Sequence, residues 1–586
     1  MATRRGIGLV LTILFLAMVI SVSGIVMLML LVGREPAVAS NSLLVLRVEG
    51  DLAEASSDSL FDPFMASRQP SLRTLVDNLR KAKADRRIEG VIVAPANLTS
   101  AYWARLQEVR DAIVDFRASG KKAYAYLEYG GDREYFLATG CDRIFMMPTS
   151  PLDLSGLASY ELFLRGTLDK IGAYPDFFHI GAYKTAPNQY TEKTFTPAHR
   201  EMSESLNRDF FEQLIQGVAE GRKKTPDEIR ALVDDGPFLA EDAVQAGLVD
   251  DLAYEDQVDD KLPPAGKVLT RLKGDDYARV SAGSAGLGTG PRIAIINAVG
   301  IINSGRSGFD PLNGPVAGSD TLVEYIRKAR KDRSIRAIVL RVDSPGGSTI
   351  ASDVIWRELT LVNAGTSPRP LIASMSDLAA SGGYYIAMAA SDIVAQPGTL
   401  TGSIGIFGGK IVTGGTYEKL GLNIEAVSVG AHAEMNSPVR PFNEAERAKL
   451  EEQLKAFYDQ FIEKVAKARR MKPEAVDAIA QGRVWTGRQA KERGLVDVLG
   501  GLDRAVALAK ERAKIPAGDS VELVFYPPKR TVWDILADGF SGMDQQAGLL
   551  ALLGARDRRA VAEVTAPLRL FRRGEPLALM PFGYLR

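Results

Sequence analysis

The stretch KDRSIRAIVL at residues 331–340 decides the fold, because a close copy, ADRRIEGVIV, stands at residues 84–93. The two are separated by 247 residues (331 minus 84). In both, a charged segment leads into a short β-branched run of the kind that forms buried strands. A match at a fixed offset is the signature of an internal repeat.

Further blocks repeat at nearly the same offset. KIG at 170–172 matches KLG at 419–421 at an offset of 249, and AGLVD at 246–250 matches RGLVD at 493–497 at an offset of 247. The small drift implies short insertions in loops, and coincidence across separate blocks is hard to sustain. We therefore predict two homologous domains, with boundaries at residues 43–280 and 292–530. Residues 281–291, rich in Gly, Ser and Ala, are predicted to be a flexible linker.

Each half alternates short apolar runs with longer helical patterns, which argues for an α/β fold with a mainly parallel sheet and crossover helices. A capping box, Asn443 with Glu446, begins a long helix predicted over Glu444–Arg470. Five buried strands are predicted in the second half: Arg292–Ala298, Arg336–Val342, Pro370–Met375, Asp392–Gln396 and Asn423–Val429.

Composition excludes several classes of function. Lys+Arg and Asp+Glu balance at 72 each, so no global charge suggests nucleic acid as a partner. One cysteine, Cys141, excludes an intrachain disulfide and a cysteine metal cluster, and we interpret it as a small buried residue. With three histidines in 586 residues, a multi-histidine metal site is improbable. No metal, nucleotide or organic cofactor is indicated.

The N-terminus predicts a membrane anchor. No charged residue occurs from residue 6 to residue 33, and roughly 20 apolar residues suffice to cross a bilayer core. Arg4 and Arg5 precede this run, so the positive-inside rule places residues 1–5 in the cytoplasm and exports the rest. A cleaved signal peptide ending near residues 37–39 is the alternative, but the run exceeds the usual signal-peptide core. We favour a retained transmembrane segment over residues 6–33.

The two halves differ where chemistry is expected. Ser381 in the second half stands opposite Asp132 in the first, at an offset of 249 (381 minus 132). Lys184 in the first half stands opposite Ala433 in the second, again at 249 (433 minus 184). Each half therefore lacks a residue that the other half has, which suggests one active site shared by both.

Ser381 lies in AASGGY, where a predicted strand gives way to a helical run. Free N–H groups at a helix start favour developing negative charge, although serine is also a common N-cap. The stretch DSPGGS at 343–348 follows another strand, and paired glycines can turn N–H groups outward to hold an oxyanion; a plain β-turn is the alternative. Lys184 lies in a nearly uncharged stretch, where desolvation would make it a neutral base; alone, it would be an exposed loop lysine.

The stretches SPGGS (344–348), AASGGY (379–384), TGSIGIF (401–407) and YKTA (183–186) resemble the long, duplicated form of the signal peptide peptidase A family. The resemblance covers roughly residues 43 to 530. It implies two domains with the fold of the Clp protease and crotonase families, preceded by one transmembrane helix. It also implies a bacterial inner-membrane serine protease with its catalytic part on the periplasmic side.

The resemblance assigns roles by position. Ser381 matches the nucleophile and Lys184 the general base, while Gly347 and Gly382 match the glycines whose N–H groups form the oxyanion hole. Ser403 matches a serine that hydrogen-bonds the lysine; a simple turn serine is the alternative. The implied function is a serine endopeptidase with a Ser–Lys dyad that degrades leftover signal peptides and similar extended chains, working as a homo-oligomer, by analogy a tetramer.

Two other functions compete with this one. A crotonase-like acyl-CoA enzyme shares the fold, but it needs neither an export anchor nor a lysine opposite the serine. A non-catalytic membrane scaffold is the third possibility. Past residue 530 the resemblance fades, and the C-terminal extension 531–586 is expected to lie at the membrane interface, to pack on the oligomer or to form a poorly ordered tail.

Overall fold

The structure is a computed structural model. It describes residues 16, 18–19, 35–54, 70–99, 102–262, 269–310, 314–364, 368–528, 576–580 and 584–585. The predicted stub 1–5, nearly all of the predicted anchor 6–33 and most of the extension 531–586 lie outside the described residues. Among the described residues, no helix has both the length and the apolar character that a membrane crossing requires.

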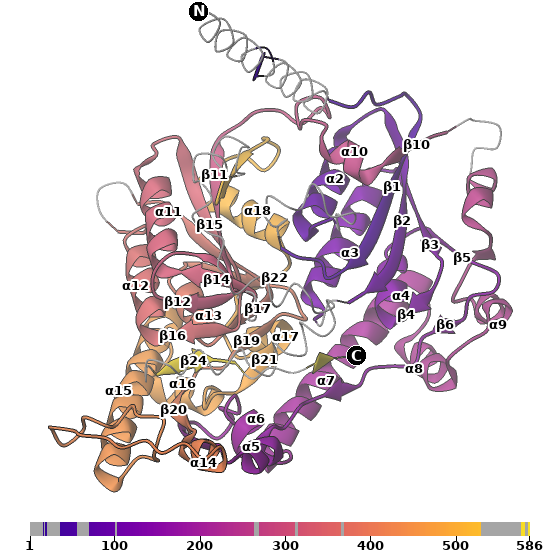
Figure 1. The fold of residues 1–586 in the computed structure, drawn as a ribbon. Coiled ribbons are helices and arrows are strands. Elements are labelled where there is room, and N and C mark those ends of the chain that lie inside the picture. Colours follow the sequence, from indigo (N-terminus) through magenta and orange to yellow (C-terminus); the bar gives the residue numbers. More distant parts are fainter. Residues whose placement is uncertain are drawn as a thin grey trace, which may run out of the picture.

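The first repeat is built on a parallel sheet with strand order β10-β1-β2-β3-β5-β9 (Figure 1). Its strands are β1 (Ser42–Gly50), β2 (Ile88–Leu98), β3 (Lys122–Leu127), β5 (Arg143–Met146), β9 (Asp251–Leu252) and β10 (Thr270–Lys273). Its helices are α2 (Leu72–Ala84), α3 (Ala104–Arg117), α4 (Asp132–Ala138), α5 (Arg165–Ile171), α6 (Asn188–Thr191), α7 (Pro197–Arg222), α8 (Pro226–Asp235), α9 (Ala240–Gln245) and α10 (Gly274–Ala278). Short pairs join β4 (Gly130–Gly131) to β6 (Leu152–Asp153) and β7 (Ser159–Tyr160) to β25 (Tyr584–Leu585).

Both faces of this sheet are buried, as expected for parallel strands with crossover helices. Because side chains alternate along a strand, Leu44 and Val91 face a large core shared with α2, α3, α4 and α7. Their neighbours Leu43 and Ile92 face a smaller cluster on the other side of the sheet. Cys141 is buried in the large core, in agreement with its interpretation as a small interior residue.

The second repeat has an equivalent sheet, in the order β21-β19-β17-β15-β11-β23; in addition, β18 pairs with β17, and β22 pairs with β18. Its strands are β11 (Arg292–Val299), β15 (Ile335–Ser344), β17 (Leu371–Ala380), β18 (Asp392–Ala395), β19 (Leu400–Gly402), β21 (Val484–Thr486), β22 (Val498–Leu499) and β23 (Glu522–Tyr526).

Its helices are α11 (Ser319–Lys331), α12 (Thr349–Thr360), α13 (Gly382–Ala387), α14 (Gly414–Lys419), α15 (Glu444–Arg469), α16 (Pro473–Ile479), α17 (Gly487–Glu492) and α18 (Leu502–Arg512). The predicted α/β fold with mainly parallel sheets is confirmed, and so is the capping box at Asn443.

A third sheet contains strands from both repeats and from the C-terminal segment, in the order β13-β14-β12-β16-β24-β20-β8. Its strands are β8 (Tyr174–Ile180), β12 (Ile301–Asn303), β13 (Gly308–Asp310), β14 (Gly314–Gly318), β16 (Gly346–Ser348), β20 (Ile406–Val412) and β24 (Leu577–Leu579). β8 belongs to the first repeat, yet it pairs antiparallel with β20 of the second, from Ile180 opposite Ile406 to Tyr174 opposite Val412. The first repeat thus enters the second just before Lys184.

One predicted strand is wrong. Residues Asn423–Val429 form no strand; they lie in an exposed arm after α14, where Val427 and Val429 are almost fully exposed. The same positions in the first repeat form β8. The physical reason is that β8 takes one edge of β20 over its whole length, from Ile406 to Val412, so this edge is closed to residues 423–429.

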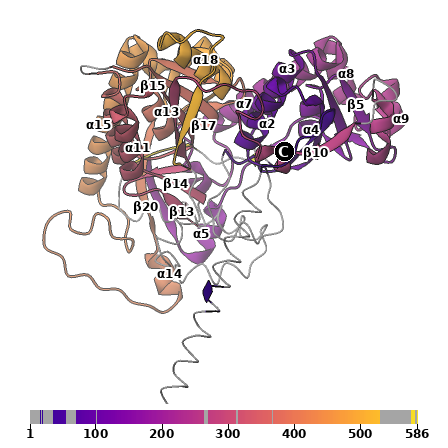
Figure 2. The same ribbon diagram turned by 90° about the horizontal axis from the view of Figure 1, so that it is seen from above.

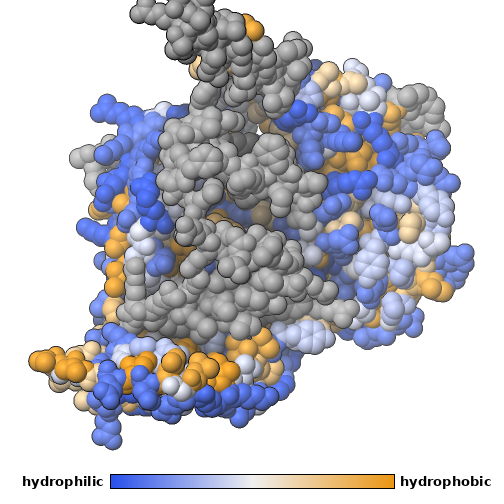
Figure 3. Space-filling model, viewed as in Figure 1, coloured by the Kyte–Doolittle hydropathy of each residue, from blue (hydrophilic) through white to orange (hydrophobic). Residues whose placement is uncertain are grey.

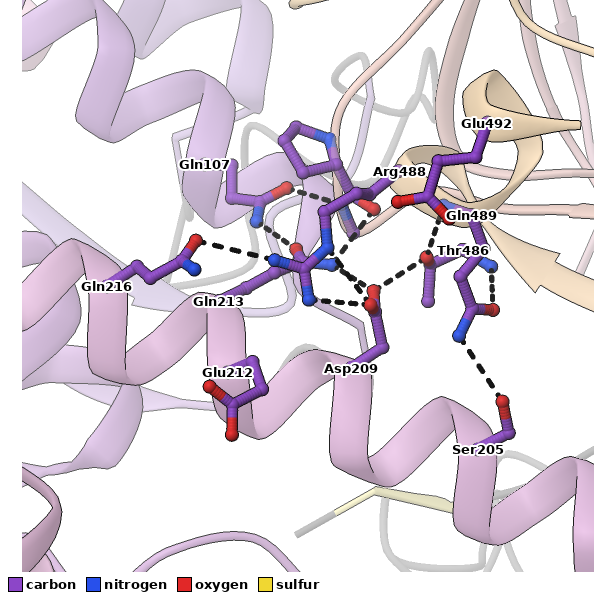
Figure 4. Close-up of polar contacts among 12 residues, drawn as sticks. Gln107, Ser205, Asp209, Glu212, Gln213, Gln216, Thr486, Arg488, Gln489 and Glu492 are labelled. Carbon is purple, nitrogen blue, oxygen red and sulfur yellow. Dashed lines mark hydrogen bonds and ion pairs between the residues drawn. The ribbon is translucent and has the colours of Figure 1, made fainter. Parts of the chain in front are cut away.

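The repeats lie side by side and α7 runs along their junction (Figures 1 and 2). On α7, Asp209 accepts hydrogen bonds from the Thr486 hydroxyl at 2.6 Å and from Arg488 Nη2 at 2.6 Å (Figure 4). Gln213, one turn later, donates to Asp209 and to the carbonyl of Pro397. Directional contacts of this kind hold the two repeats in one orientation, which a shared active site requires.

Candidate active site

Ser381 occupies a strained turn between β17 and α13. Its backbone has φ +55° and ψ −112°, a conformation that residues other than glycine seldom adopt. Its N–H donates to the carbonyl of Gly402 at 2.8 Å, which helps to hold the turn in place. The hydroxyl makes no N-cap hydrogen bond. The side chain is therefore presented to other groups rather than to its own helix.

Lys184 follows β8 and reaches Ser381 from the first repeat. Its Nζ lies 2.8 Å from Ser381 Oγ, 3.0 Å from Ser403 Oγ and 3.1 Å from the carbonyl oxygen of Ser403. A neutral amine has two N–H donors and one lone pair. An ammonium would donate all three bonds, whereas the neutral amine would donate two to Ser403 and accept one from the Ser381 hydroxyl, so the geometry accommodates both forms.

The surroundings of Lys184 favour the neutral amine. The side chain is completely buried, and this desolvation lowers the pKa of Lys184 well below its ordinary value. Within the described part of the chain, no carboxylate forms an ion pair with its Nζ. The backbone of Gly482 packs so closely that a Cβ there would lie 2.5 Å from Lys184 Cα. Close packing thus fixes the backbone of Lys184, and the burial of its side chain keeps bulk solvent from the amine.

Gly347 and Gly382 bring two backbone N–H groups to the same place. A Cβ on Gly382 would lie only 3.1 Å from the amide nitrogen of Gly347, so the two residues are adjacent. Gly347 has φ +153° and its missing Cβ would lie 2.1 Å from the carbonyl oxygen of Ile302, so a larger residue cannot fit. The strand β16 and the start of α13 therefore form a cradle of N–H groups beside Ser381.

The equivalent positions in the other halves hold no such chemistry. Asp132 begins α4, accepts a hydrogen bond from the Gly156 N–H at 3.2 Å, and has its pKa raised by burial to about 7. Ala433 lies on the exposed arm of the second repeat. Within the described residues, the hydroxyl and the amine thus meet at one site, which draws on both repeats.

Sequence reasoning missed the charged residues behind this site. Arg105 on α3 forms ion pairs with Asp343, just before the glycine loop (Gly346 and Gly347), and with Asp377, four residues before Ser381. Its backbone N–H also donates to Asp377 Oδ1 at 2.9 Å. The first repeat therefore holds the stems of both active-site loops. The only sequence signal was the position of two carboxylates: Asp343 begins the stretch DSPGGS, and Asp377 lies two residues before AASGGY.

Comparison with known protein families identifies the family of this chain. The model described as peptidase family S49 matches residues 115–268 and, a second time, residues 364–516. The chain belongs to peptidase family S49. The two matches begin 249 residues apart (364 minus 115), the offset that relates Ser381 to Asp132. The duplicated unit is thus the S49 domain, and the chain is a serine peptidase of this family with two such domains.

Relatives match this S49 peptidase over most of its length. The chloroplastic serine protease SPPA of Arabidopsis thaliana is 36% identical over 511 residues, which is 85% of this chain and 73% of the relative. Protease 4 of Salmonella typhi is 35% identical over 505 residues, 83% of this chain and 78% of its own. Protease 4 of Haemophilus influenzae is 30% identical over 531 residues, with 86% and 84% covered.

Proposed function

We propose that this S49 peptidase is an endopeptidase in which Ser381 is the nucleophile and Lys184 the general base. The observation that supports this is the 2.8 Å separation of Lys184 Nζ and Ser381 Oγ. As Oγ bonds to the carbonyl carbon of a peptide, the lone pair of the amine accepts the hydroxyl proton. Lys184 then gives this proton to the leaving nitrogen, and water hydrolyses the ester on Ser381.

Three further residues assist in this mechanism. The N–H groups of Gly347 and Gly382 stabilise the oxyanion that forms when the carbonyl is attacked. Ser403 holds the amine from the other side, because its hydroxyl and its carbonyl both lie within hydrogen-bond distance of Nζ. Two donated bonds to Ser403 leave the lone pair aimed at Ser381.

The proposed substrates are leftover signal peptides and similar extended apolar chains, as the family resemblance implies. Such chains bind proteins by adding a strand to an exposed sheet edge. The proposed location is the bacterial inner membrane, with residues 6–33 as the anchor and the two S49 domains on the periplasmic side. Its support is the uncharged run behind Arg4 and Arg5.

A serine-directed fluorophosphonate tests the assignment of the nucleophile. We expect the probe to label Ser381, and Ser381→Ala to lose both the label and the cleavage of a fluorogenic signal-like peptide. Ser391→Ala is the matched control, because that hydroxyl bonds only the Leu371 carbonyl and its own neighbour Asp392. Retained cleavage in Ser381→Ala would contradict the mechanism. An acyl-CoA enzyme would leave Ser381 unlabelled, and a scaffold would show no cleavage at all.

We also propose that the enzyme is a homo-oligomer, by analogy a tetramer, and that another copy of the chain covers the exposed arm. Leu422, Ile424, Val427 and Val429 are all strongly exposed there. Figure 3 shows apolar residues gathered on this arm at the lower left of the molecule. Exposed apolar patches of this kind mark sites of protein contact. A head-to-tail contact between copies closes into a ring when the rotation permits.

Light scattering tests this proposal. The native enzyme should have about four times the 63.4 kDa mass of one chain, whereas the double variant Val427→Glu, Val429→Glu should be smaller, because charged side chains oppose burial. Leu239→Glu is the control, since Leu239 is 70% exposed on the first repeat. A native enzyme with the mass of one chain, or a double variant with unchanged mass, would refute the proposal.

A further inference from the structure

The C-terminal strand β24 lies inside the candidate active site. It pairs antiparallel with β16, the strand that carries Gly347, from Gly346 opposite Leu579 to Ser348 opposite Leu577. On its other edge, Leu577 pairs with Phe407 of β20. The chain's own C-terminal segment therefore lies between β16, which carries the glycine loop, and β20, which pairs with the strand β8 that precedes Lys184.

Polar contacts hold both ends of this segment against the glycine loop. The N–H of Met580 donates to the carbonyl of Pro345 at 2.9 Å. At the other end, the hydroxyl of Thr349 donates to the carbonyl of Pro576 at 2.6 Å. Pro576 to Met580 therefore lies fully extended along β16, in the way that a peptide substrate adds to a sheet edge.

The register places one carbonyl of the segment beside the proposed oxyanion donors. In an antiparallel ladder, the bond between Met580 and Pro345 is accompanied by one from the Gly347 N–H to the Ala578 carbonyl. A Cβ on Gly346 would lie 2.0 Å from this carbonyl oxygen and 2.8 Å from the Gly382 nitrogen. The Ala578 carbonyl thus has the surroundings that the carbonyl of a bound substrate needs.

The side chains of the segment fill apolar pockets. Leu577 and Leu579 point to the same side and are 3% and 2% exposed. They pack in a cluster whose other buried members come from the first repeat and from β20: Leu164, Leu168, Ala173, Ala186, Tyr190 and Phe407. Ser381 and Lys184 are themselves fully buried. An external peptide that needs the same edge of β16 therefore has to displace β24.

We propose that residues 576–580 are an internal competitor for the peptide-binding groove of this enzyme. The inference rests on the proposed function, since it takes the groove beside Ser381 to be the substrate site. The groove accepts an extended apolar peptide between β16 and β20, with large aliphatic side chains on the side of Leu577 and Leu579 and a small residue at the position of Ala578. When residues 576–580 occupy this groove, substrates are excluded; substrates bind when β24 leaves the groove.

Two truncations test the proposal. A chain that ends at Glu575 lacks β24, whereas a matched chain that ends at Pro581 keeps β24 and loses only the last five residues. We expect the shorter chain to show a KM lower by about tenfold or more with kcat little changed, because a tethered segment competes at an effective concentration of about millimolar. Its Ser381 should also react faster with a fluorophosphonate. The chain that ends at Pro581 should behave as the full chain does.

A point variant and an added peptide cover the case in which truncation harms folding. Ala578→Arg in the full chain places a charged side chain at a site that is 1% exposed, so it should loosen β24 and lower KM as well. The synthetic peptide Pro-Leu-Ala-Leu-Met-Pro should inhibit the shorter chain competitively. Unchanged or raised KM in both variants would overturn the proposal. If no form of the chain is labelled at Ser381, the proposed function fails instead.

Discussion

Lys184→Ala should lower kcat/KM for a peptide substrate by about 10²–10⁴-fold, the usual contribution of general acid–base catalysis. The reason is that Lys184 Nζ is the basic group in contact with Ser381 Oγ, at 2.8 Å. The measurement is the steady-state hydrolysis of a fluorogenic peptide. Lys410→Ala is the matched control, because Lys410 is also buried but donates to the carbonyl of Met435. Near-normal activity in Lys184→Ala would show that another group is the base.

The pH dependence of activity follows from the same residue. Burial lowers the pKa of Lys184, and only the neutral amine accepts a proton, so activity should rise as pH increases through that lowered pKa. In the unfolded chain Lys184 holds its proton up to a pH of about 10.4. Between the two pKa values the unfolded state binds more protons, so this residue destabilises the fold there, and less so as pH rises. Lys184→Met should therefore raise the thermal midpoint more at neutral pH than at alkaline pH.

Arg341→Met should destabilise the enzyme by about 3–5 kcal/mol, the typical cost of breaking a buried ion pair. Arg341 on β15 is completely buried and contacts Glu54 Oε1 at 2.6 Å and Glu108 Oε2 at 2.8 Å, both from the first repeat. Without the guanidinium, two buried carboxylates lose their partner at the contact between the repeats. The measurement is the thermal midpoint of unfolding at neutral pH.

The triple variant Arg341→Met, Glu54→Gln, Glu108→Gln provides the control. It removes all three charges, so it should recover much of the loss, because no unpaired charge is left inside the protein. Arg336→Met is a second control, because it makes the same substitution in the same strand at an exposed position. The Arg336 side chain has a 3.4 Å contact with the Ala513 carbonyl. An Arg341→Met midpoint equal to that of Arg336→Met would show that the buried cluster does not join the repeats.

Much of the fold could be predicted because it depends on local patterns. The apolar runs of β11, β15 and β18 are recognisable by composition, and the repeat appears in the constant offset between KDRSIRAIVL and ADRRIEGVIV. The error at Asn423–Val429 has a different origin. Those residues have the composition of a strand, but a strand needs an edge to pair with, and β8 occupies one edge of β20 over its whole length.

The sequence by itself determined the duplication and the α/β class. It also determined that each repeat lacks one partner, because Asp132 stands opposite Ser381 and Ala433 stands opposite Lys184. Only the tertiary structure decided that β8 crosses into the other repeat, that Arg341 meets two carboxylates 287 and 233 residues away, and that β24 lies on the glycine loop. The physical reason is that edge pairing and ion pairing depend on which surfaces meet after folding. Edge pairing and ion pairing produce no periodic pattern in the sequence, whereas the burial of one face of a strand or helix produces a periodic pattern of apolar residues.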